Sequence, residues 1–552
     1  MKMFSCGGAG IYLTKHILFM EKEVHKIMLK VGVLHAPKPY VLKCPPQGLM
    51  SIAAYLRENK IIFDILDANI HFVDCKKIEK DSYQKLLNDK LYINNFNMAK
   101  QDFPEQQLTE YFLEHQFEIV LVDCNFTGTA NYSFRTIQLL RRVLPNCIII
   151  TGGIHATIFD KEILDKYPVN IVIKGEGEEI ALKIIRGYIN HDIDLADIAG
   201  ISYKENGRVI SNAGSGLVED INTLPPVYNV YEDFEIELYR DYVKAVKGPF
   251  WGDQDPTGVL LSSRGCVGRC TFCNGRVIDQ GRYRSSSVEN IIKQIDYLYT
   301  RYKPKKFGIY DAMFGGNLSS YKAVCDYFRQ RKVPWGFETR IDIMTEEKLD
   351  YLKNTNCKYI LYGLESVSLD TLIYNHKVSK ATRSDYEVKA AKLFKKTSRI
   401  HILCVISILY GLPGDDANIF NKTIRFFKEH KLNNDRYITG LFYSPIMYPG
   451  TDIWNNAKKE DRCYNWDKFF VNNENIIEEG EIIYKNPNID LSELNYYVKN
   501  SFELIQENKT KCRLINKLLS KQKRIRNLWA EGKDGLSSLF YLKWFLMSIL
   551  YS

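Results

Sequence analysis

The sequence has no long hydrophobic run, because no apolar stretch in its 552 residues reaches the ~18–20 residues that a membrane-spanning helix needs. The N-terminus also lacks a clean signal-peptide pattern, since Lys15 and His16 interrupt its apolar stretch. The last apolar stretch, residues 539–551, is shorter than a span and is broken by Lys543. We therefore expect no membrane contact.

Paired cysteines are missing as well. The thirteen cysteines are odd in number and scattered along the chain, except for one cluster. This pattern argues against a secreted disulfide framework and favours a reducing compartment, so the predicted location is the cytoplasm. Outside the cluster, we expect the cysteines to be small core residues.

A strong net charge is also missing. The formal net charge of +9 is modest for a chain of this length, so we expect no nucleic-acid partner. The densest basic segment, residues 509–526, repeats apolar residues near helical spacing and is expected to be an amphipathic helix with a solvated basic face. A metal-bearing RNA-binding protein that uses this helix is a remote alternative, and it would show steeply salt-dependent binding.

The order of apolar runs predicts the first domain. From residue 31, short apolar runs bounded by Gly, Asp and Asn alternate with helical stretches, apart from a polar and helical insertion at residues 71–117. Such runs predict a parallel sheet with helices on both faces, of Rossmann type. We assign this domain to residues 30–215, after an N-terminal extension at residues 1–29.

A second alternation follows a Pro-containing linker at residues 216–249. Six strand–helix units in series at residues 250–455 predict a partial parallel β/α barrel, a (β/α)6 unit, whose chemistry lies on the loops after the strands. Residues 456–552 are expected to be mainly helical. The predicted fold class is therefore α/β, with a Rossmann-like domain, a partial barrel and a helical C-terminal region.

Cys266, Cys270 and Cys273 form a C-x3-C-x2-C cluster on the loop after the first predicted barrel strand. A structural zinc site normally takes four ligands, and the nearest downstream histidine is His376. A ferredoxin-type cluster takes a fourth cysteine, and none follows within the loop. Three thiolates can instead hold three irons of a [4Fe–4S] cluster and leave the fourth iron open, with zinc and a distant fourth ligand as the weaker alternative.

With Phe272 before its last cysteine, this motif resembles that of the radical S-adenosylmethionine (SAM) superfamily, in which the open iron chelates the amino and carboxylate groups of SAM. Other segments resemble the branch of that superfamily with an N-terminal cobalamin-binding domain, and the resemblance covers roughly residues 30–455. In chain order, these segments are PPQGLMSIAAYL, TGGIHAT, KGEGEEIAL, GRYRSSSVENI, GIYDAMF, WGFETRID, YGLESVS, YGLPGDD and YPGT.

The resemblance implies SAM contacts from Phe272, Asp311, Arg340 and Glu365. Each residue also has a structural alternative. Arg340 and Glu365 can form a buried ion pair that holds the barrel, and Asp311 can cap the loop that follows it.

Cobalamin contacts are expected at the carboxyl ends of the strands in the first domain, where open α/β sheets bind their ligands. The D-x-H-x-x-G loop that ligates cobalt in some cobalamin domains is missing, because the loop after the first strand reads HAPKPYVLKCPPQG. His155 is therefore expected at the periphery of the cofactor, and the glycines also suit tight turns. The predicted contacts are Thr127, Gly152, Gly153, His155, Gly175 and Glu176.

The resemblance implies an enzyme that reductively cleaves SAM to a 5′-deoxyadenosyl radical. The expected function is a cobalamin-dependent methyltransferase acting on an unactivated carbon of a peptide or small-molecule metabolite. Its cofactors would be a [4Fe–4S] cluster, SAM and cobalamin, and its electron donor a flavodoxin- or ferredoxin-type protein. Cyclisation or rearrangement by a cobalamin-binding radical enzyme, and a radical SAM barrel whose first domain binds no cobalamin, are the alternatives. No residue stands out as a proton or hydrogen donor.

Overall fold

The computed structural model describes residues 29–38, 41–73, 102–246, 255–379, 386–464 and 483–505. Several predicted segments fall outside these ranges. They are residues 1–28 of the N-terminal extension, the central part of the insertion at residues 71–117, the basic segment at residues 509–526 and the apolar stretch at residues 539–551.

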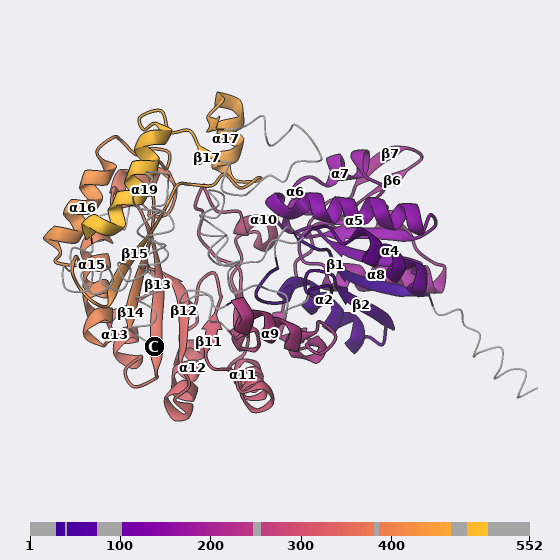
Figure 1. Cartoon of the computed structure of the whole chain (residues 1–552), viewed down its shortest axis with the longest axis horizontal. Coiled ribbons are helices and arrows are strands. Elements are labelled where there is room, and N and C mark those ends of the chain that lie inside the picture. The colour runs from indigo at the N-terminus through magenta and orange to yellow at the C-terminus, as the bar shows by residue number, and fades with distance from the viewer. Residues whose placement is uncertain are drawn as a thin grey trace, which may run out of the picture.

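The first domain contains a seven-stranded sheet in the order β2-β1-β3-β4-β5-β6-β7 (Figure 1). The first five strands of this order run parallel to one another. Strand β6 is antiparallel to β5, and β7 is antiparallel to β6. The strand order reverses between β1 and β3, which is the switch point where such sheets bind ligands. The strands are β1 (Val31–His35), β2 (Phe63–Asp67), β3 (Ile119–Asp123), β4 (Ile148–Gly152), β5 (Ile171–Ile173), β6 (Ile201–Glu205) and β7 (Arg208–Ser211).

Helices cover both faces of this sheet. Val31 and Val33 of β1 share an apolar cluster with residues of α2 and α8, whereas Leu34 shares a different cluster with residues of α4 and α5. Burial on both faces explains why these strands read as continuous apolar runs, and it confirms the Rossmann-type prediction. The helices are α2 (Gln47–Glu58), α4 (Glu105–His115), α5 (Ala130–Val143), α6 (Ile154–Ile158), α7 (Asp160–Lys166) and α8 (Glu178–Asn190), with short 3-10 turns η1 (Thr127–Thr129) and η2 (Leu195–Asp197).

The segment between the two sheets packs against the first domain. It contains the 3-10 turns η3 (Ile221–Thr223) and η4 (Val227–Val230) and the helix α9 (Ile236–Val246). In α9, the Tyr239 hydroxyl donates a hydrogen bond of 2.7 Å to Asp67 Oδ2. The predicted linker is thus an ordered part of the core where the structure describes it.

The second domain contains six parallel strands in the order β8-β11-β12-β13-β14-β15. The two outer strands, β8 and β15, do not pair with each other in the described ranges, so the sheet is an open partial barrel, as predicted. The strands are β8 (Val259–Leu260), β11 (Phe307–Ile309), β12 (Trp335–Arg340), β13 (Cys357–Glu365), β14 (Leu403–Leu409) and β15 (Ile438–Tyr443), after the 3-10 turn η5 (Pro256–Gly258).

Helices alternate with these strands and surround the barrel (Figure 1). Their buried faces carry apolar residues such as Ile295 of α11 and Phe394 of α15, which belong to the same core cluster as Phe337 of β12. The helices are α11 (Val288–Tyr302), α12 (Leu318–Arg331), α13 (Glu346–Tyr351), α14 (Leu369–Tyr374), α15 (Tyr386–Arg399) and α16 (Ile419–Glu429).

The described part of the C-terminal region is largely helical, as predicted. It contains α17 (Asp452–Glu460), a two-stranded antiparallel ladder of β16 (Cys463–Tyr464) and β17 (Ile483–Tyr484), and α19 (Leu491–Ile505). Helix α19 docks on the barrel, where Ser501 Oγ lies 2.6 Å from the Tyr410 hydroxyl.

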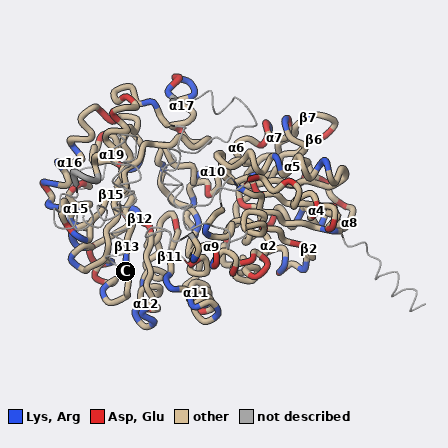
Figure 2. The backbone as a smooth tube through the Cα atoms, in the orientation of Figure 1, with Lys and Arg blue, Asp and Glu red and all other residues tan. Residues whose placement is uncertain are grey.

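The two domains share buried apolar surface. Ile171 of the first sheet and Phe337 of the barrel belong to one continuous cluster of buried side chains. Figure 2 shows basic and acidic residues interleaved along both domains. Among the helices in the described ranges, none combines the length and the apolar character required to cross a bilayer.

Candidate cofactor sites

The three clustered cysteines lie on one loop at the carboxyl end of the barrel sheet. The loop follows β8 and the short strand β9 (Ser263–Arg264), and it leads into α10 (Gly275–Asp279). Gly265 opens the loop with a φ of +82°, and a Cβ at this position would collide with the Arg282 carbonyl. Since only glycine adopts this conformation readily, the backbone fixes where the cysteine loop starts. The triplet therefore lies at the edge of the sheet where β/α barrels carry their chemistry.

The three thiols are close enough to influence one another. Burial, and then the charges of Cys270 and Cys266, raise the pKa of the Cys273 thiol. The loop winds tightly around the first thiol, because the Gly268 N–H donates to Cys266 Sγ at 3.3 Å and a Cβ on Gly268 would lie 3.2 Å from that sulfur. The Cys266 and Cys270 side chains are half-buried and Cys273 is exposed. All three thiols therefore remain available to metal.

A single metal ion and an iron–sulfur cluster place different demands on the three thiols. In the described ranges, no three Cys, His, Asp or Glu side chains are arranged to hold one metal ion. Zinc, with Zn–S bonds of ~2.3 Å, requires sulfurs within about 4 Å of one another. An iron–sulfur cube binds each thiolate to a different iron, so its ligands lie further apart.

Thr271, between the second and third cysteines, ties the loop to its neighbours. Its hydroxyl donates to Asn375 Oδ1 at 2.6 Å and its N–H donates to the Asn375 carbonyl at 3.1 Å. Asn375 Nδ2 in turn donates to the Pro413 carbonyl at 2.7 Å. The C-terminal end of α14 thus holds the cysteine loop and is itself tied to the loop after β14. Nothing in the sequence around Asn375 predicts this role.

Arg340, at the end of β12, lies beside the cysteines. Its Nη1 is 3.6 Å from Cys270 Sγ, and its Nε and Nη2 donate to the two carboxylate oxygens of Asp342 at 2.9 and 2.7 Å. Burial lowers the pKa of Arg340, but the hydrogen bond with Asp342 and the nearby thiols outweigh it and keep the guanidinium charged. Arg340 thus supplies positive charge at the cysteine loop.

Glu365, at the end of β13, pairs with a lysine. Lys377 Nζ donates to its Oε1 at 3.1 Å, and Ser407 Oγ donates to its Oε2 at 3.3 Å. Glu365 adopts a φ of +67° beside an irregularity in the β13–β14 register, and such strain in a non-glycine residue is typical of functional sites. Arg340 and Glu365 have different partners, so the predicted alternative of an ion pair between them is wrong.

Asp311 and Phe272 are largely occupied by contacts within the protein. Asp311 is buried and accepts hydrogen bonds from the Ser262 N–H at 2.7 Å, the Ser263 hydroxyl at 2.7 Å and the Ser262 hydroxyl. These contacts hold the strand that leads to the cysteines. Phe272 is half-buried and packs against an apolar cluster that includes Trp454 of α17.

A cavity of about 690 Å³ lies between the carboxyl ends of β3, β4 and β5 and the start of the cysteine loop. Its volume is in the ~300–1,000 Å³ range of cofactor sites. Gly152, Gly153, Gly175 and Glu176 line this cavity, and a Cβ on Gly48, which also lines it, would meet no atom within 4 Å. Four of the six predicted cobalamin contacts therefore lie in the wall of this cavity, and the wall is open at Gly48.

Two of the predicted cobalamin contacts lie beside the cavity and not in its wall. Thr127 Oγ1 and His155 Nδ1 lie 3.0 Å apart, and the His155 ring lies near Phe134 and Phe159. Burial lowers the pKa of His155 to about 3, so the ring is neutral. No histidine is among the described residues that line the cavity, in agreement with the missing D-x-H-x-x-G motif.

Glu176 lines the cavity, and its carboxylate is held by the barrel domain. Arg284, in the short strand β10 (Arg284–Ser285), donates to both oxygens at 2.7 and 2.8 Å, and the Val218 N–H donates to Oε2 at 2.7 Å. Burial raises the pKa of Glu176, but these hydrogen bonds and the nearby Arg264 lower it overall. The carboxylate is therefore an ion-pair partner within the protein.

Asp123 is a cavity residue that the sequence analysis did not select. It ends β3 and accepts from Lys38 Nζ at 3.0 Å and from the Ala36 N–H at 2.8 Å, with His35 Nδ1 at 3.1 Å. Burial raises its pKa, but His35 and Lys38 outweigh burial and lower the pKa overall. In the sequence, the position of Asp123 at the end of a predicted strand was the feature that could have indicated a ligand-binding role.

Two family models match the chain. Residues 260–427 match the radical SAM superfamily, and residues 39–185 match the B12-binding domain. The first range contains the cysteine loop, and the second contains most of the first sheet. The matches confirm the predicted cofactors, which are a [4Fe–4S] cluster with SAM for one domain and cobalamin for the other.

Individual proteins are similar over most of the chain. An uncharacterized methyltransferase of Pyrococcus horikoshii is 28% identical, over 77% of this chain and 81% of its own length. An anaerobic magnesium-protoporphyrin IX monomethyl ester cyclase of Cereibacter sphaeroides is 21% identical, over 66% of this chain and 57% of its own length.

A solved structure has the same fold. The radical SAM methyltransferase TsrM from Kitasatospora setae, with cobalamin and a [4Fe–4S] cluster bound, superposes with a TM-score of 0.63 at 15% identity, covering 85% of this chain and 91% of that chain. Both family models and this common architecture agree with the predicted family. The chain belongs to the radical SAM enzymes that carry an N-terminal B12-binding domain.

Proposed function

We propose that this enzyme is a cobalamin-dependent methyltransferase that acts on an unactivated carbon of a small molecule or peptide. The observation that carries the proposal is the cavity between the two domains. Its wall includes Gly152 and Gly175 from the B12-binding domain and Arg264 and Gly265 from the barrel, directly before Cys266. A cofactor in this cavity would lie next to the loop that holds the cluster.

The cluster with SAM supplies a 5′-deoxyadenosyl radical, and cobalamin supplies a methyl group, while the protein orients both and excludes water. We propose that Cys266, Cys270 and Cys273 hold the cluster. Arg340 offsets part of the negative charge of the three thiolates, since it lies 3.6 Å from Cys270 Sγ. The pair formed by Thr271 and Asn375 fixes the loop between the last two cysteines.

We propose that Glu365 and Arg340 contact SAM, because they stand at the carboxyl ends of the adjacent strands β13 and β12, and Arg340 lies beside Cys270. Asp311 and Phe272 act indirectly in this proposal, because the contacts of Asp311 with Ser262 and Ser263 and the packing of Phe272 position the cysteine loop. On the cobalamin side, Gly152, Gly153 and Gly175 contact the cofactor in this proposal, because all three line the cavity. Thr127 and His155 support this wall from behind.

A radical cyclisation or rearrangement is the second candidate, and the similarity to the magnesium-protoporphyrin ester cyclase favours it. The products separate the two candidates. A methyltransferase forms S-adenosylhomocysteine and adds one methyl group to its substrate, whereas a cyclase forms a product without an added methyl group.

We propose a flavodoxin- or ferredoxin-type protein as the electron donor, because the cluster requires a low-potential single electron. The proposed location is the cytoplasm. All nine cysteines whose state the structure describes are free thiols, which is compatible with a reducing compartment.

Cofactor content tests the proposal. The protein is purified without oxygen, supplied with iron, sulfide and hydroxocobalamin, and freed of unbound cofactor before iron and cobalt are measured. The expected content is about four irons and one cobalt per chain. Iron without cobalt would contradict the methyltransferase.

Replacement of a cysteine tests the cluster ligands. Cys270→Ala should lose most of the iron and at least ~100-fold of 5′-deoxyadenosine formation, because the cube loses one of three anchors. Cys147→Ala, at a buried cysteine of the B12-binding domain, is the control and should keep its iron. Undiminished 5′-deoxyadenosine formation by Cys270→Ala would refute the assignment.

A further inference from the structure

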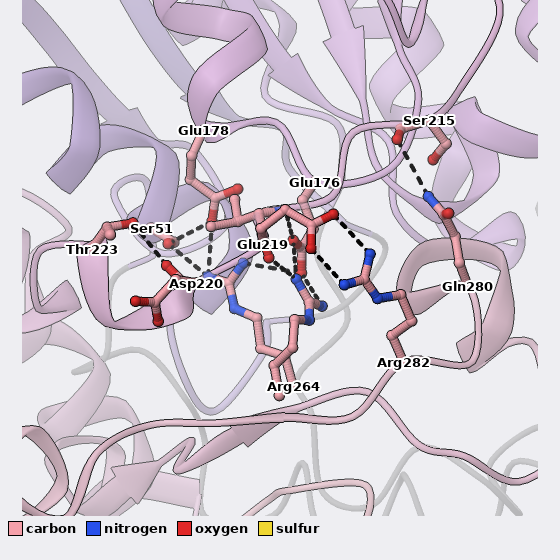
Figure 3. Close-up of polar contacts among 12 residues, drawn as sticks. Ser51, Glu176, Glu178, Ser215, Glu219, Asp220, Thr223, Arg264, Gln280 and Arg282 are labelled. Carbon is pink, nitrogen blue, oxygen red and sulfur yellow. Dashed lines mark hydrogen bonds and ion pairs between the residues drawn. The ribbon is translucent and has the colours of Figure 1, made fainter.

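Arg264 links the cysteine loop to the B12-binding domain. It ends β9, two positions before Cys266. Figure 3 shows its guanidinium pointing toward the carboxylates of the other domain. Its Nη2 donates to Glu178 Oε1 at 2.8 Å and to Ser51 Oγ at 2.9 Å, and its Nη1 lies 3.2 Å from Glu176 Oε1.

The partners of Arg264 are well buried. The side chains of Glu178 and Glu176 are 3% and 6% exposed. Glu178 is also fixed by Ser51, whose hydroxyl lies 2.7 Å from Glu178 Oε1. The Arg264 side chain is 25% exposed, so these ion pairs are partly buried. Partly buried pairs are screened less than surface pairs, and removal of Arg264 leaves the buried carboxylate of Glu178 without its cation. These contacts therefore constrain the distance between the two domains.

A second arginine repeats the connection on the neighbouring strand. Arg284 of β10 is the antiparallel partner of Arg264 in β9, and it binds both oxygens of Glu176. A planar guanidinium that binds a carboxylate through two hydrogen bonds fixes orientation as well as distance. The two strands β9 and β10, which form a two-stranded sheet of their own in the barrel domain, thus bind the loop after β5 and the first turn of α8.

The same residues form one wall of the cavity. Ser51, Glu176, Glu178, Arg264 and Arg284 all line it. The start of the cysteine loop and the cobalamin wall are therefore connected by direct contacts between side chains, and a shift of one shifts the other.

We propose that Arg264 is a positioning residue that sets how SAM on the cysteine loop meets cobalamin in the cavity. The inference rests on the proposed function, because it concerns the meeting of the two cofactors. Cleavage of SAM at the cluster needs only the barrel, whereas transfer of the SAM methyl group to cobalamin needs the correct placement of the two domains. Loss of Arg264 should therefore impair the second reaction selectively.

Two products report the two reactions without a substrate. Methyl transfer breaks the S–CH3 bond, leaves the bonding pair on sulfur, forms a Co–CH3 bond with an electron pair of cobalt(I) and releases S-adenosylhomocysteine. Reductive cleavage breaks the S–C5′ bond with one electron from the cluster and yields methionine and a 5′-deoxyadenosyl radical, which takes a hydrogen atom from a C–H bond of glycerol in the buffer to form 5′-deoxyadenosine. Titanium(III) citrate supplies the electrons for both reactions.

The experiment compares Arg264→Gln with Arg282→Gln in the reconstituted enzyme. Arg282 lies on the same segment and forms an ion pair of 2.5 Å with Glu219, but these side chains are 49% and 71% exposed (Figure 3). Such surface pairs contribute little. Iron and cobalt are measured in each protein, and both products are expressed per bound cofactor. Arg264→Gln should lower the ratio of S-adenosylhomocysteine to 5′-deoxyadenosine at least ~tenfold, and Arg282→Gln should keep the wild-type ratio.

A second measurement uses the cofactor-free chain. Hydrogen exchange of the peptide over residues 262–273 should be at least ~tenfold faster in Arg264→Gln than in wild type or in Arg282→Gln, because the loop loses its anchor. Arg264→Lys should restore part of the wild-type product ratio and of the wild-type exchange rate. The lysine ammonium keeps the positive charge but cannot form the paired hydrogen bonds of a guanidinium. Glu178→Gln removes the ion pair between Arg264 and Glu178 by a change in the B12-binding domain. It replaces Arg264→Gln in both measurements if Arg264→Gln fails to fold.

The outcomes separate this inference from the proposed function. An unchanged product ratio together with unchanged exchange in Arg264→Gln and Glu178→Gln would overturn the positioning role. Absence of S-adenosylhomocysteine from the wild-type enzyme would overturn methyl transfer, and the exchange data would then still decide whether Arg264 anchors the loop.

Discussion

The guanidinium of Arg340 lies 3.6 Å from the sulfur of Cys270 and is held in place by both carboxylate oxygens of Asp342. This arrangement brings a permanent positive charge to a loop of three thiols. An iron–sulfur cluster gains negative charge when it is reduced, so a nearby cation favours the reduced state.

Arg340→Gln should therefore make the cluster harder to reduce. We expect a midpoint potential about 50 mV more negative than in wild type, which for one electron corresponds to slightly less than a tenfold change in the reduction equilibrium. A redox titration followed by electron paramagnetic resonance measures this shift. Arg331→Gln is the matched control and should leave the potential unchanged, because Arg331, the last residue of α12, forms an exposed ion pair with Asp296 of α11. Equal potentials in all three proteins would rule out an electrostatic role for Arg340.

The sequence was sufficient for the parts of the structure that depend on local pattern. The strand around Val120 reads as an apolar run because both faces of the first sheet are covered, and this burial also made the sheet predictable. The cysteine loop was readable because its three thiols lie within eight positions of one another. Short spacing leaves few arrangements of the side chains.

Contacts between distant residues were not predictable. Glu178 and Arg264 are separated by 86 positions, and only the packing of the two domains brings them together. The hydrogen bonds of Asp311 are a second example, since the family resemblance predicts a contact with SAM and says nothing of its partners within the protein. In the structure, Ser262 and Ser263 occupy its oxygens, because the register of β8 beside β11 brings both serines to that strand end.

Glu338, on β12 below Arg340, makes stability depend on pH. Burial, and then the nearby Glu365, raise the pKa of Glu338 from 4.5 to about 7. No hydrogen bond engages its carboxyl group in the described ranges. Between these two pH values, the folded chain holds a proton that the unfolded chain has lost, so the group increasingly destabilises the fold as pH rises and does so fully above pH 7.

Glu338→Gln should remove this penalty. At pH 8 we expect the free energy of unfolding of the variant to exceed that of wild type by about 1–3 kcal/mol, and the difference should shrink as pH falls toward 4.5. Urea unfolding of the cofactor-free chain at several pH values measures it. Glu429→Gln, at an exposed position of α16, should change stability by less than about 0.5 kcal/mol. A difference that stays constant with pH would show that Glu338 is ionised in the folded chain.

His155 should be dispensable for cobalamin and important for the fold. Its ring lies beside Thr127 and two aromatic rings and not in the cavity wall. His155→Gln should therefore keep the cobalt content of wild type and lose about 1–3 kcal/mol of stability. His191→Asn, at an exposed helix end with a φ of +58° that asparagine tolerates, should alter neither quantity. Loss of cobalt from His155→Gln without loss of stability would make His155 a cofactor contact.

The same histidine gives a distinct pH dependence. Because burial lowers its pKa from 6.5 to about 3, the unfolded chain binds a proton at His155 below pH 6.5 and the folded chain does not. The stability that the neutral ring contributes is present above pH 6.5 and is lost as pH falls toward 3. This part of the acid sensitivity should be absent from His155→Gln, and acid-unfolding curves of the two proteins test it.

Gly48 offers a direct test of where cobalamin binds. It lies in the first turn of α2 and lines the cavity, and a Cβ there would meet no atom within 4 Å. Gly48→Phe should therefore fold, fill part of the cavity and weaken cobalamin binding at least ~tenfold, because the ring competes for the volume of the cofactor. Iron content and 5′-deoxyadenosine formation should remain, since the cysteine loop is untouched.

Gly48→Ala is the matched control, because it should keep its cobalt and gain up to about 1 kcal/mol of stability from helix propensity. If Gly48→Phe bound cobalamin as tightly as wild type, the cofactor would have to lie outside this cavity, and the proposed meeting of SAM and cobalamin beside Arg264 would have to be abandoned with it.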